Sequence, residues 1–259
     1  MKVLITNDDG IDSIGLRSLS EVFSQEFETY VVAPEKQRSA LGHSITTHKP
    51  LRIKEVDLGV KNVKAYSTNG LTADCVILAK DILIKDIDFV VSGINELPNV
   101  GDDITYSGTI SGSMEGVING IPSISVSILY FKENLKKASF FSKEVVKYLL
   151  KNPLKKGTFL NINFPGEGEI KGVKITKIGH VWYKNRTIER KDPLGRPYYW
   201  IIGEAVWEGN SEEDTWAVKN GYISISPLHI DLLDYEIYKE LLKKEEIFNE
   251  ILLKIWKKF

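Results

Sequence analysis

The stretch KVLITNDDGIDSIGLRSLSEVFSQEFETYVVAP, residues 2–34, decides the fold class. Residues 3–5 form a short apolar run typical of a buried strand, and residues 29–33 form a second run that ends at a proline. The segment between them carries apolar residues at helical spacing: Leu16, Leu19 and Phe23. A strand, a helix and a second strand within about thirty residues form a right-handed βαβ unit, so the sequence predicts a parallel sheet.

The same alternation continues along the chain and predicts an α/β protein with a mostly parallel sheet flanked by helices. We expect further helices over residues 71–82, 110–119 and 134–150, with Ser13 as the N-cap of the first helix. We expect further strands over residues 45–48, 88–93, 121–126, 158–163 and 221–226.

Two segments lie outside this alternation. Residues 172–208 are rich in β-formers and aromatics around a turn signal at residues 192–195, which predicts a projecting β-hairpin arm. Residues 234–256 repeat apolar side chains at helical spacing, which predicts an amphipathic helix that packs on the core or on a neighbouring subunit. We therefore expect a single α/β domain over residues 1–259, with these approximate parts: core, 1–165 and 215–233; arm, 166–214; C-terminal helix, 234–257.

Composition excludes several classes of protein. The 259 residues include 34 Lys and Arg against 35 Asp and Glu, a net charge of -1, which argues against a broad basic surface for a nucleic-acid polymer. The single cysteine, Cys75, excludes an internal disulfide and favours a reducing compartment. No run approaches the roughly 20 apolar residues of a membrane span. We expect a soluble, cytoplasmic protein that binds no membrane.

The first polar loop follows the first predicted strand and contains adjacent carboxylates, Asp8 and Asp9. Ligand sites in open parallel sheets lie beyond the carboxyl ends of the strands. Two neighbouring carboxylates repel each other unless a proton or a cation lies between them. Oxygen-rich sites of this kind suit Mg²⁺, Mn²⁺ or Ca²⁺. Taken alone, the pair is equally well explained as a polar loop that caps the next helix.

Three more polar loops follow later elements. Asn95 follows the strand expected at 88–93 and offers an amide oxygen, and Ser39 offers a hydroxyl in the loop after the second strand. The small residues at 106–112 open the helix expected at 110–119, where exposed N–H groups and the helix end favour a phosphate. An ordinary helix cap is the alternative for that loop. Together, the four loops favour a site for a metal-bound phosphate ester.

Several stretches in this chain resemble the SurE family, the stationary-phase survival protein E group of metal-dependent nucleotide phosphatases. The first of them are ITNDDGI (5–11), VVAPEKQRSALGHSIT (31–46), STNGLTADCV (67–76), VSGIN (91–95) and NVGDDITYSGTISGSMEG (99–116). Later stretches are FLNINFP (159–165), DPLGRPYYWI (192–201) and GYISISPLH (221–229). They occur in the expected order and are spread over most of the chain.

This resemblance implies a Rossmann-like fold and the hydrolysis of nucleoside 5′-monophosphates, often also of 3′-monophosphates, with one divalent cation as cofactor. It implies homodimers or homotetramers formed through the arm and exchanged C-terminal segments. The implied metal ligands are Asp8, Asp9, Ser39 and Asn95, of which Asp8 and Asp9 are also the expected catalytic residues. The implied phosphate contacts are Asn7, Ser107, Gly108 and Thr109.

One stretch departs from the family pattern. Leu97 stands where the family usually has glycine, and Glu96 places a negative charge beside a site for anions. We expect this to alter substrate preference rather than to remove the metal. Two alternatives stay open: a broad-scope acid phosphatase or exopolyphosphatase, and a non-catalytic, metal-dependent nucleotide-binding module. His43 lies in a motif and is expected either near the site or in a structural hydrogen bond.

Overall fold

The computed structural model of the chain describes residues 1–130, 134–166, 168–184 and 186–256. The chain divides into two compact units, Met1–Leu228 and His229–Phe259. Among the described residues, no helix combines the length and the apolar character that crossing a membrane requires.

The first unit is built on a nine-stranded sheet with the order β3-β4-β2-β1-β5-β6-β7-β13-β8. β1 (Lys2–Thr6) lies between β2 (Glu28–Pro34) and β5 (Phe89–Asn95) and runs parallel to both. The other strands are β3 (Ile53–Val56), β4 (Val63–Thr68), β6 (Ser123–Ile128), β7 (Thr158–Phe164), β8 (Val173–Ile175) and β13 (Ile223–His229). β3 pairs antiparallel with β4, whereas β2–β4, β5–β6, β6–β7 and β13–β8 are parallel. The predicted mostly parallel α/β sheet is confirmed.

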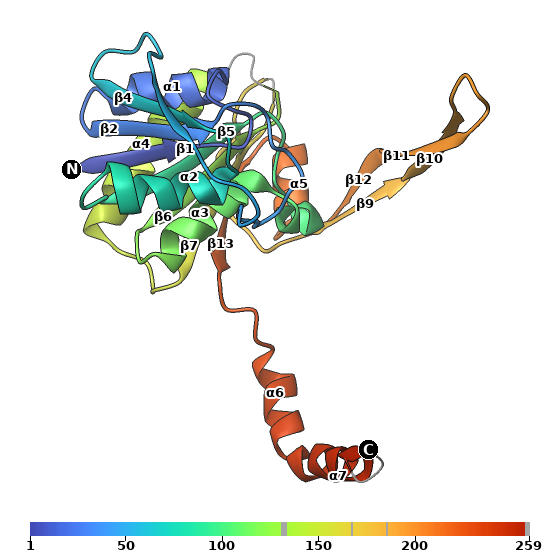
Figure 1. Cartoon of the computed structure of the whole chain (residues 1–259). Coiled ribbons are helices and arrows are strands. Elements are labelled where there is room, and N and C mark those ends of the chain that lie inside the picture. Colours follow the sequence, from blue (N-terminus) through green and yellow to red (C-terminus); the bar gives the residue numbers. More distant parts are fainter. Residues whose placement is uncertain (131–133, 167, 185, 257–259) are drawn as a thin grey trace. The chain divides into compact units, whose positions relative to one another are not determined.

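Helices cover both faces of this sheet (Figure 1). Successive side chains of a strand point to opposite faces, so Val3 and Ile5 join one apolar cluster and Leu4 joins the other. α1 (Ile14–Phe23) and α4 (Leu135–Lys151) pack together over the first face. α2 (Thr72–Leu78) and α3 (Gly108–Ile118) pack together over the second. The result is three layers, with the sheet in the middle.

Three local features differ from the expectations. Ser13 is the N-cap of α1, but its hydroxyl makes no hydrogen bond within the described part of the chain. Residues 45–48 are not a strand, because the Thr46 N–H bonds to Asp74 Oδ1 at 2.9 Å instead of to a neighbouring strand. The elements that the sequence analysis missed are β3, β4, α5 (Asp214–Lys219) and the short helix η2 (Gly101–Thr105). The helix expected over 71–82 is present as α2 followed by an irregular helical turn, Ala79–Leu83.

The predicted hairpin arm is present but begins later than expected. β9 (His180–Lys184) pairs antiparallel with β12 (Glu204–Glu208), and β10 (Thr187–Lys191) pairs antiparallel with β11 (Pro197–Ile201). Figure 1 shows this arm as a ribbon of paired strands separate from the nine-stranded sheet. β8 lies inside the range expected for the arm. It pairs with β13 instead and is the edge strand of the main sheet on that side.

The second unit contains two helices, α6 (Tyr235–Leu242) and α7 (Glu245–Trp256), where one was expected. The Lys244 N–H bonds to the Leu241 carbonyl at 2.9 Å, a tight i→i−3 bond that closes α6 before α7 begins. Residue 257, the last of the expected helix, lies outside the described residues. Neither helix has a buried residue.

Candidate active site

Asp8 lies at the carboxyl end of β1 and is buried against the start of α3. Its Oδ1 atom accepts a hydrogen bond from the Thr109 hydroxyl at 2.6 Å. A Cβ atom at position 108 would lie 2.6 Å from the Asp8 Cβ, so glycine is required for this close approach. The structure thus brings together Asp8, Gly108 and Thr109, which were predicted from separate loops.

Asp9 is half-buried, and one oxygen of its carboxyl group lacks a partner among the described residues. Its Oδ2 atom is buried without a hydrogen-bond partner in the described part of the chain. Burial, and then the negative charges of Asp8 and Glu96, raise the pKa of Asp9 to about 7. Burial also raises the pKa of Asp8. A cation between the two carboxylates would offset this charge, so they fit the expected metal.

Asn95 is the last residue of β5 and lies beside the end of β1, because Thr6 and Ser92 are paired in the register of the two strands. The Asn95 amide nitrogen donates a hydrogen bond to the Leu97 carbonyl at 2.6 Å. This bond uses the nitrogen and leaves the amide oxygen as an acceptor. The oxygen is therefore suited to a cation bound by the neighbouring carboxylates.

The loop that contains Ser39 is attached to the same region through its backbone. The Arg38 N–H donates to the Asp8 carbonyl at 2.7 Å. Ser39 itself is exposed, and its hydroxyl accepts a hydrogen bond from Gln37 Nε2 at 2.9 Å. The structure brings the loop to Asp8 but shows no hydrogen bond between the Ser39 side chain and the carboxylates within the described residues.

Two of the expected phosphate-binding residues already hold their own loops. The Asn7 amide donates to the Gly10 carbonyl at 3.0 Å and accepts from the Gly10 N–H at 3.2 Å. The Ser107 hydroxyl accepts from the Ile110 N–H at 3.1 Å and so caps α3. The Ser111 N–H also donates to the Ser107 carbonyl, and, although burial raises the pKa of Asp8, a backbone hydrogen bond from Gly108 acts to lower it. The Ser107 hydroxyl hydrogen and the Thr109 N–H have no partner described in this part of the chain and could bind an anion.

The donor atoms of this site are all oxygens. No group of three or more His, Cys, Asp or Glu side chains is placed to hold a metal within the described ranges. The two carboxylates therefore need neutral oxygens to complete a coordination sphere, and Asn95 and Ser39 offer them. Such a set suits Mg²⁺, Mn²⁺ or Ca²⁺ rather than Zn²⁺.

Sequence reasoning missed a cluster of buried asparagines next to this site: Asn99, Asn161 and Asn163. The signal was two asparagines at alternate positions of the otherwise apolar strand expected at 158–163. For His43, the sequence left two alternatives open, a place near the site or a structural hydrogen bond. His43 Nε2 lies 2.8 Å from Glu115 Oε2, so its side chain ties the Ser39 loop to α3, which matches the structural alternative.

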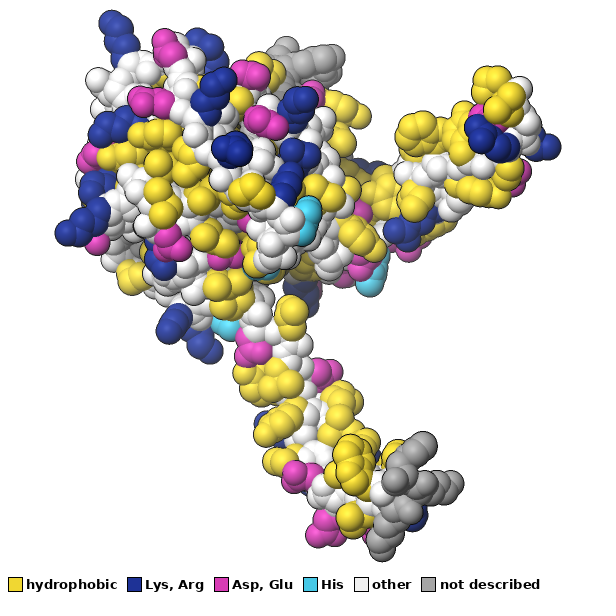
Figure 2. Space-filling model, viewed as in Figure 1, with side chains coloured by type: hydrophobic (Ala, Val, Ile, Leu, Met, Phe, Trp, Pro, Cys, Tyr) yellow, Lys and Arg dark blue, Asp and Glu magenta, His cyan; other side chains and the backbone are white. Residues whose placement is uncertain are grey.

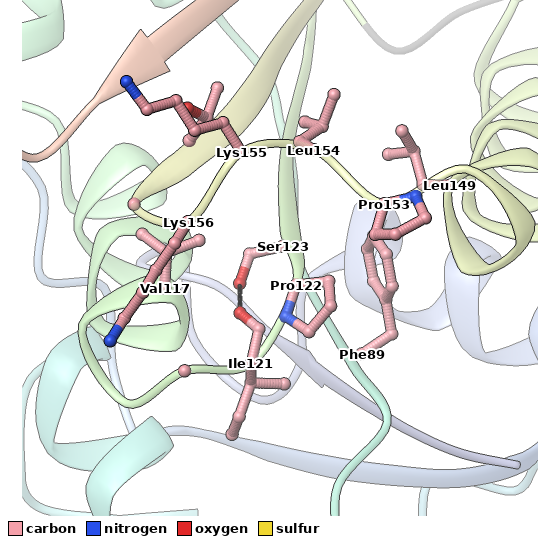
Figure 3. Close-up of a pocket in the computed structure, with 13 residues that line it drawn as sticks. Phe89, Val117, Ile121, Pro122, Ser123, Leu149, Pro153, Leu154, Lys155 and Lys156 are labelled. Carbon is pink, nitrogen blue, oxygen red and sulfur yellow. Dashed lines mark hydrogen bonds between the residues drawn. The ribbon is translucent and has the colours of Figure 1, made fainter.

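A separate hollow lies away from these residues. A cavity of about 190 Å³ is found where β5, β6 and β7 begin (Figure 3). Asp8 instead follows the carboxyl end of β1, so the cavity and Asp8 lie at opposite ends of the parallel strands. Pro122, Leu154 and Phe89 line it, with Lys155 beside them, and the Ser123 hydroxyl bonds to the Ile121 carbonyl at 2.9 Å. None of the predicted site residues lines this cavity.

Comparisons with known proteins show the family to which the chain belongs. The sequence pattern of the family described as Survival protein SurE matches residues 3–185. A 5′-nucleotidase SurE of Pelotomaculum thermopropionicum is 43% identical over 96% of this chain and 98% of its own length. One of Moorella thermoacetica is 46% identical over 93% and 95%. The crystal structure of a SurE protein from Aquifex aeolicus superposes with a TM-score of 0.81 at 40% identity, covering 95% of this chain and 100% of that one.

Proposed function

The chain belongs to the Survival protein SurE family, and from this premise we propose that it is a divalent-metal-dependent 5′-nucleotidase. It hydrolyses nucleoside 5′-monophosphates, and also 3′-monophosphates, to nucleoside and phosphate. The observation that carries the proposal is the contact between Asp8 and the start of α3, because it joins a carboxylate site for a cation to an N–H cradle for a phosphate.

Asp8, Asp9, Asn95 and Ser39 would hold the cation, which is Mg²⁺ or Mn²⁺ in this proposal. When bound, the cation polarises a phosphoryl oxygen and lowers the pKa of a water molecule. Thr109 holds one oxygen of Asp8 in a fixed direction through its 2.6 Å hydrogen bond. Asp9 would take the proton from the attacking water, because its Oδ2 has no hydrogen-bond partner among the described residues.

The start of α3 supplies the phosphate-binding groups. The Gly108 and Thr109 N–H groups belong to the first turn of α3, where backbone N–H groups have no partner within the helix. Together with the Ser107 hydroxyl hydrogen and the amide of Asn7, they bind the phosphoryl oxygens and offset their charge. The absence of a side chain at Gly108 lets the start of α3 lie close to Asp8, so that these groups and the carboxylate face the same site.

A panel of substrates tests this proposal. Phosphate release is measured from nucleoside 5′- and 3′-monophosphates, nitrophenyl phosphate and short polyphosphate, with Mg²⁺, Mn²⁺ or excess chelator. We expect the monophosphates with metal to be hydrolysed fastest and the chelator to abolish the activity. Equal rates on nitrophenyl phosphate would indicate a broad-scope phosphatase. Nucleotide binding without phosphate release would indicate a non-catalytic module.

We also propose that the arm and the C-terminal segment form the contacts of a homodimer or homotetramer in the cytoplasm. Apolar side chains gather on both elements (Figure 2). On the arm, Tyr199, Trp200 and Ile201 are each about 60–80% exposed, and in the C-terminal unit the exposed residues include Leu232 and Trp256. Such a density of exposed apolar side chains is typical of an interface. The arm and the C-terminal segment are, in this proposal, parts of a single α/β domain over residues 1–259.

Removal of the C-terminal segment tests this assembly. A chain that ends before Leu233 lacks α6 and α7. We expect light scattering to report a smaller oligomer for it than for the full chain. An unchanged oligomer would contradict the role of the C-terminal segment, and a monomeric full chain would contradict the assembly itself.

A further inference from the structure

Three asparagine side chains are buried beside the candidate site. Asn161 and Asn163 lie on β7, and Asn99 lies in the loop that follows β5. Their exposed fractions are 0%, 0% and 8%. A buried amide is unfavourable unless its hydrogen bonds are made, so the partners of these amides indicate what they hold in place.

Two of these amides, those of Asn161 and Asn163, hold the backbone of the third residue, Asn99. Asn163 Oδ1 accepts from the Asn99 N–H at 2.8 Å, and its Nδ2 donates to the Asn99 carbonyl at 3.1 Å. Asn161 Nδ2 donates to the same carbonyl at 2.7 Å. The Asn99 side chain in turn donates to the Ser127 hydroxyl at 2.8 Å. The Asn163 side chain therefore bonds to both backbone polar groups of Asn99, the N–H and the carbonyl.

The anchor lies next to the candidate metal ligand Asn95. In the sheet register, Asn95 on β5 pairs with Ser127 on β6, and Ser127 pairs with Asn163 on β7. These three strands are neighbours (Figure 1). The loop after Asn95 must therefore fold back over the strand ends for Asn99 to reach Ser127 and Asn163.

The short segment between Asn95 and Asn99 is stiff. The Asn95 amide nitrogen bonds to the Leu97 carbonyl at 2.6 Å, and Pro98 follows with its restricted φ and a buried side chain. A displacement of Asn99 would thus be transmitted to Asn95 rather than absorbed by the loop.

We propose that Asn163 is a positioning residue for the metal site: it fixes Asn99 so that the Asn95 side-chain oxygen is presented beside Asp8 and Asp9. Asn163 acts through Asn95 and binds neither cation nor substrate. An amide is required because the position must accept one hydrogen bond and donate another, which leucine cannot do. The proposal rests on the proposed function only in taking Asn95 as a ligand.

Binding of Mn²⁺ alone, followed by the electron paramagnetic resonance signal of the free ion, tests the proposal. We compare wild type, Asn95→Ala, Asn163→Leu and the double variant. Asn163→Leu is expected to weaken Mn²⁺ binding by about 10–100-fold, the usual range for a residue that orients a ligand. Because it acts through Asn95, the double variant should bind no more weakly than Asn95→Ala. The positioning role would be overturned if folded Asn163→Leu bound Mn²⁺ as tightly as wild type. It would also be overturned if the losses of Mn²⁺ affinity in the two single variants multiplied in the double variant.

Two further variants separate positioning from general destabilisation. Ser127→Ala removes only the acceptor for the Asn99 side chain and should weaken binding by less than about 10-fold; it decides the matter if Asn163→Leu does not fold. Asn134 is a matched control, because it is also buried and donates to the Gly166 carbonyl at 2.8 Å away from the site. Asn134→Leu should lower thermal stability and leave Mn²⁺ binding unchanged, and equal weakening in both leucine variants would contradict a specific role.

Phosphate release from adenosine 5′-monophosphate by the same wild-type preparation distinguishes the two proposals. If the wild type hydrolyses the nucleotide but Asn163→Leu and Ser127→Ala bind Mn²⁺ normally, the positioning role fails and the function stands. If Mn²⁺ binding follows the expected pattern without hydrolysis, the function fails and the positioning role stands.

Discussion

The candidate site has a buried half and an exposed half, and they are held in place by different means. The buried half is Asp8, Gly108 and Thr109, joined by a 2.6 Å hydrogen bond between β1 and α3. The exposed half contains Ser39, whose described hydrogen bond is to its own loop. The difference teaches that the fold sets the direction of the Asp8 side chain in the buried half, whereas in the exposed half it holds the loop but not the Ser39 hydroxyl against the carboxylates.

The largest effect is expected from the buried half. Asp8→Asn keeps the size of the side chain and removes its charge, so both the cation site and the contact with α3 are altered. We expect kcat/KM for a nucleoside 5′-monophosphate to fall by more than the roughly 100-fold typical of outer-sphere partners. Steady-state kinetics at a fixed Mn²⁺ concentration checks this, and a loss below 10-fold would show that Asp8 is dispensable.

A smaller loss is expected when Asp8 keeps its charge but loses its partner. Thr109→Val removes the hydroxyl that donates to Asp8 Oδ1 and preserves the shape of the side chain. We expect a fall of about 10–100-fold in kcat/KM, with activity largely restored in Thr109→Ser. Ser111→Ala is the matched control, because the Ser111 hydroxyl lies on the same helix and is buried without a hydrogen-bond partner in the described residues. Equal losses at positions 109 and 111 would count against a specific contact.

A substitution in the exposed half should have a weaker effect, and it should change the Mn²⁺ requirement rather than kcat. Ser39→Ala removes one neutral oxygen from an exposed loop, so we expect the Mn²⁺ concentration for half-maximal activity to rise by less than about 10-fold, with kcat at saturating Mn²⁺ nearly unchanged. Ser44→Ala, in the same loop, removes a hydroxyl bonded to the Leu41 carbonyl and should change neither parameter. A loss as large as that of Asp8→Asn would erase the distinction between the halves.

The smallest effect concerns stability and pH in the metal-free protein. The pKa of Asp9 is about 7 in the folded chain against an ordinary value of 3.8, so the unfolded chain releases this proton first. Burying the carboxylate therefore destabilises the fold progressively as pH rises from about 4 to 7, and fully above that. With chelator at pH 8, Asp9→Asn should raise Tm by about 2–4 °C, as about 1 kcal/mol does in domains of this size.

The sign of this shift is checked by calorimetry at two pH values. At pH 4 the gain in Tm should be much smaller than at pH 8, because Asp9 is then protonated in the folded chain and the pH is close to the ordinary value of 3.8, where the unfolded carboxyl is still partly protonated. A gain that is larger at pH 4 than at pH 8 would mean that Asp9 is stabilised, not strained, as a carboxylate.

The sequence allowed the sheet and the positions of the polar loops to be predicted, because apolar runs such as residues 3–5 and 29–33 are buried in the centre of the sheet. β3 escaped prediction, since it is an edge strand whose residues are all at least partly exposed. The break between α6 and α7 escaped it too, because no glycine or proline marks the turn at Lys244.

The candidate site was predictable as a set of residues but not as a set of contacts. Asp8 and Thr109 are 101 residues apart, and only the packing of α3 against the strands makes them partners. Local spacing carries no information about such a pair. The same holds for Asn163, whose role depends on which residue the loop after β5 brings to it.

The central claim is that the ends of β1 and β5 and the Ser39 loop form one cation site. The most direct measurement is the anomalous scattering of Mn²⁺ in a crystal of the protein. The account predicts a single strong peak in contact with oxygens of Asp8, Asp9, Asn95 and Ser39. A peak that contacts neither Asp8 nor Asp9 in crystals of active, Mn²⁺-loaded protein would contradict it.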